Sequence, residues 1–387
     1  MTAPVLESKL YAKARLPLEQ AETMPPLCYT SKDFYDEEVK NIFRKTWNFV
    51  GREDEIGANE DYLTADVVGE SIIVIRDRTG KINAFANTCR HRGTRLLAGN
   101  GNCRLISCPY HAWAFAPNGE LVAAPGMEGV AGFDKADFGL IPIRLESWGG
   151  FMFVTFDKNA PSLMDYLGDA VTTYAPYNFA NMVCTRRKEY DLACNWKLYV
   201  ENAMEDYHTA TVHRVSIGKQ ICSRVPSTPN WDAIHMPGEK TCAILSGDTT
   251  PFPHIPTLEG QSAGGTFFSV VYPNWFFATT HDCMWWLHVA PKGPTRSVVT
   301  HGACFPRETV ARPDFQTEVQ KYYKRWDKSL PEDNEISELQ QAGLESSLAQ
   351  PGRLSLLEPV VHAMDLWVLD MVLDGKPSRA ANGAGAR

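Results

Sequence analysis

The chain has 387 residues, with 38 lysines and arginines against 46 aspartates and glutamates and a formal net charge of −8. This length predicts two or three domains that bury their own cores. Hydrophobic residues make up 44% and charged residues 22%, a composition that excludes disordered, collagen-like and coiled-coil chains. The acidic balance argues against binding to nucleic acid or anionic lipid, so we expect a small-molecule substrate.

Neither a membrane span nor a signal peptide is expected. No stretch reaches the roughly 20 apolar residues that cross a bilayer, and the opening residues MTAPVLESKLYAKARL lack the apolar core of a signal peptide. Ten cysteines are too few for a disulfide scaffold in a chain of this length. We therefore expect a cytoplasmic protein with free thiols and no contact with a membrane.

The first part of the chain predicts a helical segment followed by a small all-β domain. Ser31 can cap a helix whose apolar residues continue to Trp47, so residues 1–47 are expected to pack as a helical segment on the domain that follows residue 157. Over residues 48–157 short β runs alternate with turn signals, of which Asp77-Arg78-Thr79-Gly80 and Asn118-Gly119 are the clearest.

The rest of the chain mixes helical and strand-like patterns. The helical runs LMDYLGDAVTTYA and NWKLYVENAMEDYH precede the aromatic strand runs TFFSVVYPNWFFATTH and MWWLHVA, and a helical stretch from about Arg312 to Asp374 follows. The mixture predicts an α+β fold, with residues 158–374 forming the larger antiparallel-sheet-and-helix domain. The tail, residues 375–387, is expected to be disordered.

Two cysteine–histidine pairs occur in the predicted β domain. Cys89-x-His91 is followed by sixteen residues and then by Cys108-x-x-His111, each pair in a loop between short strands. Thiolates on one iron and imidazoles on the other hold a [2Fe-2S] cluster of raised reduction potential. Zinc uses the same residue types, but its motifs usually pair Cys with Cys and His with His. The spacing therefore favours the iron-sulfur cluster, with zinc as the alternative.

A second group of metal-binding side chains lies in NWKLYVENAMEDYHTATVH. Residues three and four apart share a helix face, so Glu201, Glu205 and His208 are expected to line up, with His213 where the helix ends. Two histidines and a carboxylate are the ligands of mononuclear non-haem iron(II) oxygenases. Taken alone, the run also fits a surface helix with solvated side chains. The cluster motif upstream favours the metal site.

Together these motifs resemble the catalytic alpha subunit of Rieske-type non-haem iron oxygenases, over nearly the whole chain. The carrying residues are C-x-H…C-x-x-H and the run Asn195-Trp196-Lys197…Glu201-Asn202…Tyr207-His208…His213. The resemblance implies an all-β Rieske domain at 48–157 and a catalytic domain at 158–374. It also implies the ligands of the two metal centres: Cys89, His91, Cys108 and His111 for a [2Fe-2S] cluster, and His208 and His213 for mononuclear iron(II).

The family's third iron ligand is an acidic residue late in the chain, in an Asp-rich segment followed by glutamine. Glu332-Asp333-Asn334-Glu335, leading to Gln340-Gln341, fits that pattern. The resemblance therefore assigns Asp333 as the ligand. Glu332 and Asp327 are the nearby alternatives.

The family usually carries an aspartate three residues before the first iron-binding histidine, where it connects the cluster of one subunit to the iron of the next. Here Glu205 stands at that position, beside Asp206, and the helical spacing to His208 favours Glu205 as the connecting residue. A glutamate resembles the branch acting on carnitine, choline and glycine betaine. The following Asp206-Tyr207 departs from the Cys-Tyr expected in that branch.

By this resemblance the chain is expected to be the terminal oxygenase of a multicomponent system. Electrons from NAD(P)H would arrive through a flavin/iron-sulfur reductase, directly or through a ferredoxin, and a head-to-tail homotrimer would bring each cluster beside a neighbour's iron. The expected reaction is O2-dependent hydroxylation of a small molecule, including oxidative N-dealkylation of a quaternary ammonium compound. Aromatic ring hydroxylation or cis-dihydroxylation is one alternative, and a non-enzymatic Rieske electron carrier is another.

Two further features are left open by the sequence. Glu201 either supports the iron ligands through hydrogen bonds or is an exposed helix carboxylate. Five aromatic residues of the predicted strands have three alternative roles: they line an apolar cavity, form a cage for a cationic nitrogen, or belong to the core. These residues are Trp275, Phe276, Phe277, Trp285 and Trp286.

Overall fold

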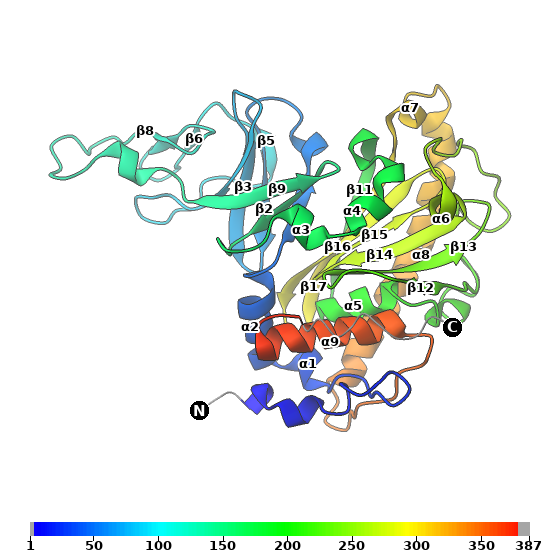
Figure 1. The fold of residues 1–387 in the computed structure, drawn as a ribbon. Coiled ribbons are helices and arrows are strands. Elements are labelled where there is room, and N and C mark those ends of the chain that lie inside the picture. The colour runs from blue at the N-terminus through cyan, green and yellow to red at the C-terminus, as the bar shows by residue number, and fades with distance from the viewer. Residues whose placement is uncertain (1–3, 378–387) are drawn as a thin grey trace. The chain divides into compact units, whose positions relative to one another are not determined.

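The computed structural model describes residues 4–377, so the part of the expected tail from residue 378 onward lies outside the described residues. The chain divides into two compact units (Figure 1). We call Arg44–Leu163 the β unit, and the remainder, up to Phe43 and from Met164, the α+β unit. Among residues 4–377, no helix combines the length and the apolar character needed to cross a membrane.

The β unit is built on an antiparallel sheet with the strand order β1-β10-β9-β4-β3-β2-β5. A smaller sheet, in the order β6-β7-β8, carries part of the metal-binding motif. The strands of the unit are β1 (Asn48–Arg52), β2 (Asp61–Val67), β3 (Glu70–Arg76), β4 (Ile82–Ala86), β5 (Asn100–Asn102), β6 (Ile106–Ser107), β7 (Ala114–Phe115), β8 (Leu121–Ala123), β9 (Pro142–Trp148) and β10 (Phe151–Thr155). Short 3-10 helices, Glu53–Ile56 and Lys135–Phe138, lie between strands.

Both turn signals of the β unit are confirmed. The Asp77 N–H donates to the Lys81 carbonyl at 2.8 Å and the Asp77 carboxylate accepts from the Thr79 N–H at 2.9 Å, which closes the β3–β4 hairpin. Gly119 turns the β7–β8 hairpin with a φ of +91°, a conformation that a side chain would strain. Local turn chemistry therefore sets the register of both hairpins.

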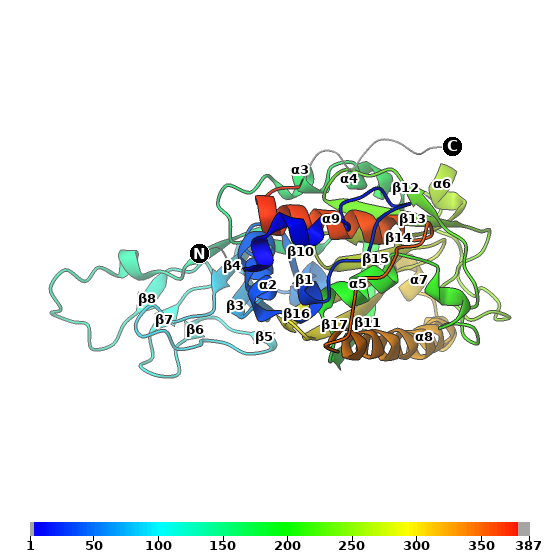
Figure 2. The ribbon, with the colours of Figure 1, turned by 90° about the horizontal axis from the view of Figure 1, so that it is seen from below.

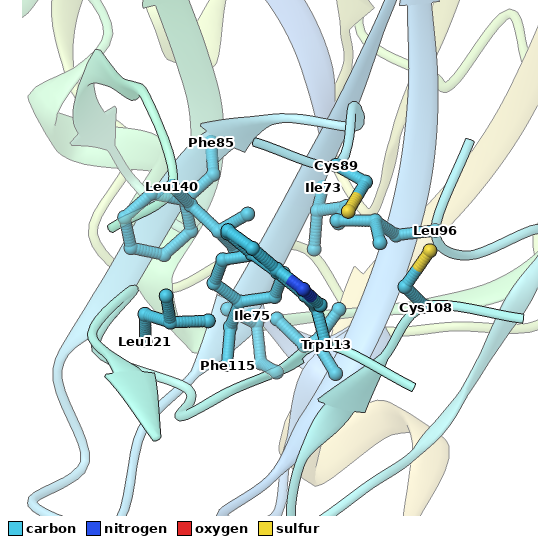
Figure 3. Packing of buried hydrophobic residues seen from close by; sticks show 11 residues of the cluster. Ile73, Ile75, Phe85, Cys89, Leu96, Cys108, Trp113, Phe115, Leu121 and Leu140 are labelled. Atoms are coloured by element: carbon cyan, nitrogen blue, oxygen red, sulfur yellow. The ribbon is translucent and has the colours of Figure 1, made fainter. Parts of the chain in front are cut away.

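The core of the β unit gathers around Trp113, which is 2% exposed. Figure 3 shows this cluster, with the side chains of Cys89 and Cys108 packed in it beside aliphatic and aromatic groups from β3 and β7. The two cysteines are therefore held by the same core that stabilises the unit.

The α+β unit contains a second antiparallel sheet, in the order β11-β17-β16-β15-β14-β13-β12. Its strands are β11 (Met182–Leu192), β12 (Ser223–Val225), β13 (Trp231–Pro237), β14 (Gly265–Val271), β15 (Trp275–Thr279), β16 (Met284–Gly293) and β17 (Arg296–Pro306). The aromatic runs predicted as strands are β14, β15 and β16. Every residue of β14 and β15 is buried, which means that both faces of the sheet are covered at these strands.

Helices α5, α8 and α9 form the other layer, and Figure 2 shows α5 lying between α8 and α9. The α-helices are α1 (Leu27–Thr30), α2 (Lys32–Glu38), α3 (Leu163–Leu167), α4 (Ala170–Thr173), α5 (Trp196–Ala203), α6 (Gly260–Ala263), α7 (Arg307–Val310), α8 (Phe315–Leu344) and α9 (Pro359–Asp374). Shorter helical turns are Pro4–Leu6, Ser8–Tyr11, Val39–Phe43, Ala175–Tyr177, Phe179–Asn181 and His208–Ala210.

Two expected helices differ in extent from the structure. Ser31 caps α2 as predicted, with its Oγ accepting from the Phe34 N–H at 3.4 Å, but the helical turns end at Phe43, so Trp47 lies outside them. The closing helical stretch is divided into α8 and α9, because residues 345–358 contain Pro351 and Gly352, which favour a break.

The prediction of one continuous helix from Asn195 to His208 is wrong. Helix α5 ends at Ala203, and His208 begins a separate 3-10 turn. The Glu205 carboxylate explains this second start, because it accepts the backbone N–H of His208 at 3.0 Å and so satisfies a free donor at the beginning of the turn. Glu205 and His208 meet through this contact and not through a shared helix face.

Candidate metal centres

The cysteine–histidine pairs lie on two loops with the same backbone pattern. In each loop the cysteine carbonyl accepts from the N–H four residues later, at Gly93 and Ala112, with N···O distances of 2.9 and 3.1 Å. The cysteine N–H donates to the carbonyl five residues later, at Thr94 and Trp113, over 2.8 and 2.7 Å. Each loop therefore curls around its own cysteine.

The cluster donors separate into a buried pair and an outer pair. Cys89 and Cys108 are each 4% exposed, whereas the imidazole of His91 is exposed and that of His111 is half-buried. The two imidazole centroids lie 4.7 Å apart, and His91 stacks on Trp113 at 5.0 Å and 8°. Two inner sulfurs and two outer imidazoles fit the two irons of a Rieske-type cluster.

Backbone N–H groups point at both sulfurs. Burial raises the pKa of the Cys89 thiol, and backbone hydrogen bonds from His91 and Arg92 oppose this. At Cys108 burial also acts to raise the pKa, but hydrogen bonds from Tyr110 and His111 outweigh it and the pKa is lowered. Such donors stabilise thiolates, the form that binds metal.

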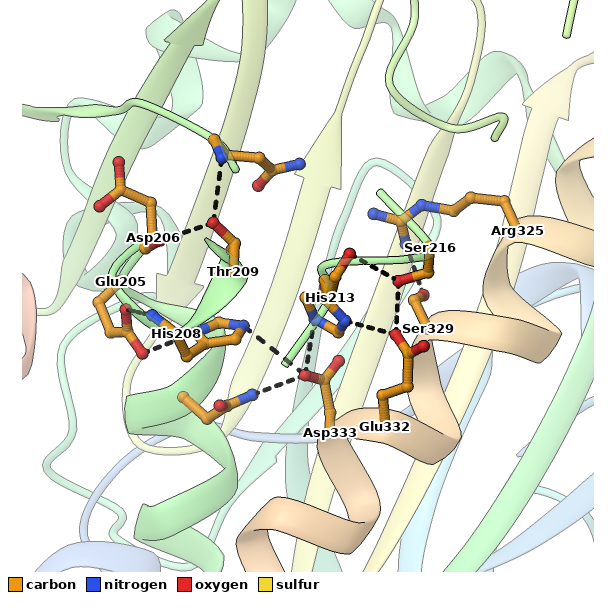
Figure 4. Close-up of polar contacts among 12 residues, drawn as sticks. Glu205, Asp206, His208, Thr209, His213, Ser216, Arg325, Ser329, Glu332 and Asp333 are labelled. Atoms are coloured by element: carbon orange, nitrogen blue, oxygen red, sulfur yellow. Dashed lines mark hydrogen bonds and ion pairs between the residues drawn. The ribbon is translucent and has the colours of Figure 1, made fainter. Parts of the chain in front are cut away.

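The second site brings His208, His213 and Asp333 together, with one ligand atom from each lying within 4.8 Å of the others (Figure 4). His213 Nε2 is 2.9 Å and His208 Nε2 is 3.7 Å from Asp333 Oδ1. Asp333 lies within α8, two residues after its internal Pro331.

The outer ring nitrogens of both histidines contact carboxylates. His208 Nδ1 lies 2.6 Å from Glu205 Oε1, and His213 Nδ1 lies 2.7 Å from Glu332 Oε2. These contacts leave both Nε2 atoms facing Asp333, as metal-binding imidazoles require. Asn202 Nδ2 donates to Asp333 Oδ1 at 3.0 Å and orients that carboxylate.

The alternative ligands occupy other positions. Glu332 contacts the far side of His213 and accepts from the Ser216 hydroxyl, so it supports a histidine instead of facing the centre. Asp327 pairs with Arg186 and with Lys188, whose Nζ is 2.5 Å from the carboxylate. Asp206 accepts the Cys222 N–H and does not take the place of Glu205 beside His208.

The candidate iron site combines imidazole groups with carboxylates. Burial alone would lower the pKa of His213, but hydrogen bonds with Asp333 and Glu332 raise it above its usual value. A buried imidazole that faces carboxylates can therefore bind either a proton or a metal cation. Two histidines and one carboxylate match the ligands of an iron(II) site with open positions.

The three donors open onto a cavity between the sheet and the helices of the α+β unit. Of the five aromatic residues left open by the sequence, Phe276 and Trp285 line it, whereas Trp275, Phe277 and Trp286 belong to the buried core. The lining also includes Asn202, Glu205, Gln220, Ile234, Phe268, Leu287, Arg325 and Leu330. A small organic molecule in this cavity lies beside the metal-binding groups.

Glu201 is buried and does not contact the three donors, so its exposure on a helix surface is excluded. It is 8% exposed, accepts from the Tyr29 hydroxyl at 3.0 Å and bonds to Asp365 on α9. Burial raises the pKa of Glu201 to about 7. This carboxyl therefore belongs to the packing of α5 against α9.

Sequence reasoning missed Arg325, Asn202 and the supporting role of Glu332. Arg325 precedes Asp333 by eight residues on α8, a spacing that leaves the two side chains about 80° apart around the helix, so that both can face one cavity. This spacing indicates a role for Arg325 only if Asp333 is already assigned as a ligand and the helix is known to be continuous.

Comparison with protein families gives two matches. Residues 179–374, half of the chain, match the ring hydroxylating alpha subunit (catalytic domain). Residues 46–134 match the Rieske [2Fe-2S] domain. The two matched segments contain all of the donors described above.

Curated relatives include the carnitine monooxygenase oxygenase subunit of Escherichia coli (strain K12), which is 38% identical over 199 residues, 50% of this chain and 53% of the relative. The match thus spans about half the length of that relative. The glycine betaine monooxygenase oxygenase subunit of Chromohalobacter salexigens is 28% identical over 383 residues, covering 90% of this chain and 84% of the relative.

Solved structures share the fold. A quaternary ammonium Rieske monooxygenase in complex with gamma-butyrobetaine matches with a TM-score of 0.76 and 25% identity, over 96% of this chain and 99% of the other. Naphthalene 1,2-dioxygenase from Rhodococcus sp. matches with a TM-score of 0.78 at 21% identity, over 96% and 100%. Because the identity to naphthalene 1,2-dioxygenase is only 21%, this likeness concerns the fold alone.

Proposed function

The chain belongs to the ring-hydroxylating alpha-subunit family and carries a Rieske [2Fe-2S] domain, and on that premise we propose that it is the terminal oxygenase of a multicomponent system. The observation that carries the proposal is the group His208, His213 and Asp333, whose donors face one cavity. A second domain without such a group would fit an electron carrier. With it, the α+β unit is suited to oxygen chemistry on a bound substrate.

The donor sets fit the two metal centres of this family. Cys89 and Cys108 would hold one iron of the cluster through sulfur, and His91 and His111 the other through nitrogen. His208, His213 and Asp333 would hold mononuclear iron(II), which when bound supplies dioxygen activation with electrons delivered from the cluster. We further propose residues 48–157 as the Rieske domain and 158–374 as the catalytic domain, with 1–47 packed on the latter.

The protein's own groups have separate tasks in this scheme. Glu205 and Glu332 hold the two histidines so that Nε2 faces the metal, and Asn202 holds Asp333. Apolar side chains such as Phe268 and Leu287 exclude water from the substrate carbon. We assign to Glu205 the additional task of connecting His208 with the cluster of a neighbouring subunit.

We propose a quaternary ammonium or other N-alkyl compound as the substrate. The relatives named for carnitine, choline and glycine betaine support this class, and the aromatic rings of Phe268 and Phe276 line the cavity, where an ammonium group can lie against a ring face. One oxygen atom enters a C–H bond next to nitrogen, and the other leaves as water with two electrons from NAD(P)H and two protons. The carbinolamine then releases an aldehyde and the dealkylated amine.

The system requires a reductase as its electron donor, and we propose a flavin/iron-sulfur reductase acting directly or through a ferredoxin. We also propose a head-to-tail homotrimer, a closed heterologous assembly; a related structure is described in terms of inter-subunit electron transfer. A cytoplasmic location is proposed because none of the ten cysteines, which include the proposed cluster ligands Cys89 and Cys108, forms a disulfide in the structure, and a reducing compartment preserves thiols.

A single-turnover experiment tests the function. The protein is reduced without oxygen, then exposed to oxygen with N-alkyl amines, betaines and simple aromatics, and the products are identified by mass. Loss of an alkyl group from an amine or a betaine is the expected result. Addition of two oxygens to a ring would establish ring dihydroxylation instead, and no product from an iron-loaded protein would favour the electron-carrier alternative.

A further inference from the structure

The cavity contains a buried cationic side chain that the proposed chemistry does not use. Arg325 lies on α8, is 5% exposed and lines the same cavity as His208, His213 and Asp333. Figure 4 shows its guanidinium directed from the helix toward the side on which His213 lies. A residue in this position is available to a substrate and hidden from bulk solvent.

The guanidinium is poorly satisfied by the protein. Arg325 donates to the Ser329 hydroxyl at 3.1 Å, but its buried Nε has no hydrogen-bond partner, and within residues 4–377 no carboxylate lies within 4.0 Å of it. Burial lowers the pKa of Arg325, yet an arginine stays protonated in proteins. A buried charge without a paired anion is costly, and a bound anion would compensate for it.

The position of Arg325 also sets the polarity of the cavity. Its guanidinium carbon lies 5.0 Å from the centroid of the Trp285 ring, so a substrate ammonium group at that ring would meet a like charge. Asp333 follows eight residues later on the same helix, with its backbone about 12 Å farther along the axis, and its carboxylate interacts electrostatically with Arg325 without forming an ion pair. The cavity therefore has a cationic part at Arg325, whereas at the other side the carboxylates of Asp333 and Glu205 offset the charge of a bound iron(II).

Resting on the proposed function, we propose that the substrate is a zwitterion whose carboxylate binds Arg325. A bidentate pair with the guanidinium would fix the carboxylate, and the N-alkyl end would then extend toward Asp333 and the metal ligands. This assignment favours betaine-like and carnitine-like compounds over amino alcohols. It makes Arg325 a specificity-determining residue.

Three matched probes test the charge preference of the wild-type protein. Glycine betaine carries both charges, choline has an alcohol in place of the carboxylate, and tert-butylacetate has carbon in place of the ammonium nitrogen. Binding to the iron-loaded, full-length protein is measured by calorimetry without oxygen, so that no turnover occurs. We expect glycine betaine to bind roughly tenfold or more tightly than choline, since a charged hydrogen bond contributes on that order.

Variants of Arg325 then test whether the charge preference depends on this residue. Arg325→Gln should weaken the binding of glycine betaine and tert-butylacetate by roughly tenfold to a hundredfold and leave choline nearly unchanged. Arg325→Lys should retain part of the affinity, because a lysine keeps the charge but loses the bidentate geometry. Arg296→Gln is the matched control, since Arg296 forms an exposed ion pair with Asp191 on the sheet and should change none of the three affinities.

The outcomes separate this inference from the proposed function. Equal wild-type affinity for glycine betaine and choline, or an equal loss of all three probes in Arg325→Gln, would overturn the role of Arg325 and leave the ammonium substrate standing. Arg325-dependent binding of tert-butylacetate alone would support the carboxylate site and overturn the ammonium substrate. If Arg325→Gln does not fold, the wild-type comparison and Arg325→Lys decide the question.

Discussion

At the scale of single residues, the mononuclear site depends on how its two histidines are held. Each imidazole has a carboxylate behind it, Glu205 for His208 and Glu332 for His213. A carboxylate in this position fixes the ring orientation and raises the basicity of the nitrogen that faces the metal. Two adjacent residues of α8, Glu332 and Asp333, therefore differ in their contacts, and we propose that the first supports a histidine and the second binds the metal.

Replacing the supporting carboxylate should weaken metal binding without abolishing it. Glu332→Gln is expected to lower the affinity for iron(II) by roughly tenfold to a hundredfold, because the amide holds His213 less strongly. Competition with a chelator measures the affinity, and the cluster spectrum should be unchanged. Glu335→Gln, on an exposed position of the same helix, is the control. Equal iron binding in the two variants would remove the supporting role of Glu332.

Removing the third ligand should have a larger effect. Asp333→Ala is expected to lose the mononuclear iron while the cluster spectrum persists, since two histidines alone leave the metal without its anionic ligand. Asp327→Ala should keep the iron, because Asp327 pairs with Arg186 and Lys188 away from the site. Iron analysis of both variants is the measurement. Iron retained in Asp333→Ala and lost in Asp327→Ala would show that the ligand is assigned wrongly.

At the scale of elements, helix α5 is fixed by buried polar contacts to α2 and α9. Lys197 Nζ lies 2.6 Å from Glu38 on α2, and both side chains are fully buried. Glu201 bonds to Asp365 on α9, and two carboxyl groups in contact require a shared proton. Burial raises the pKa of Glu201 to about 7 and that of Asp365 well above its ordinary value.

This pair predicts a loss of stability as the pH rises. The folded protein holds a proton on the Glu201–Asp365 pair that an unfolded glutamic acid releases above its ordinary pKa of 4.5, so the free energy of unfolding falls between about pH 4.5 and 7. The decrease is on the order of a few kcal/mol, and the raised pKa of Asp365 adds to it. Calorimetric unfolding temperatures at a series of pH values measure it.

Asp365→Asn should reduce that pH dependence, because the amide donates a hydrogen bond to an ionised Glu201 without needing the shared proton. Asp374→Asn, at the exposed end of α9, is the control and should keep the wild-type slope. A wild-type protein whose unfolding temperature is constant or rises from about pH 5 to 7 would contradict the prediction.

The elements also show how far the sequence reasoning reached. Strands β14 to β16 and the hairpin turns were predictable, because aromatic runs and Asn-Gly or Asp-x-x-Gly turns act locally. The end of α5 at Ala203 was not, since it depends on Glu205 capping the next turn. The candidate cluster and iron donors were predicted from motif spacing together with the resemblance to Rieske-type oxygenases. Arg325 was not, because an arginine in a long polar helix looks like a solvated one until its tertiary surroundings are known.

At the scale of the whole molecule, the two metal sites lie on different units of the chain. The cluster loops belong to Arg44–Leu163, and the mononuclear site belongs to the other unit. Turnover requires electrons to pass from one site to the other. In the proposed head-to-tail trimer the transfer occurs between neighbouring subunits, and this route can be separated from transfer within one subunit by mixing two inactive variants.

The mixed-oligomer experiment combines Cys108→Ser, which lacks a cluster ligand, with Asp333→Ala, which lacks an iron ligand. Each variant alone should be inactive. When the two are co-expressed in equal amounts, half of the subunits can donate and half can accept electrons, so transfer across each interface should restore about a quarter of the wild-type turnover. The same variants mixed after separate assembly should remain inactive unless subunits exchange. Transfer within single subunits predicts no activity in any mixture, since no chain then carries both intact sites.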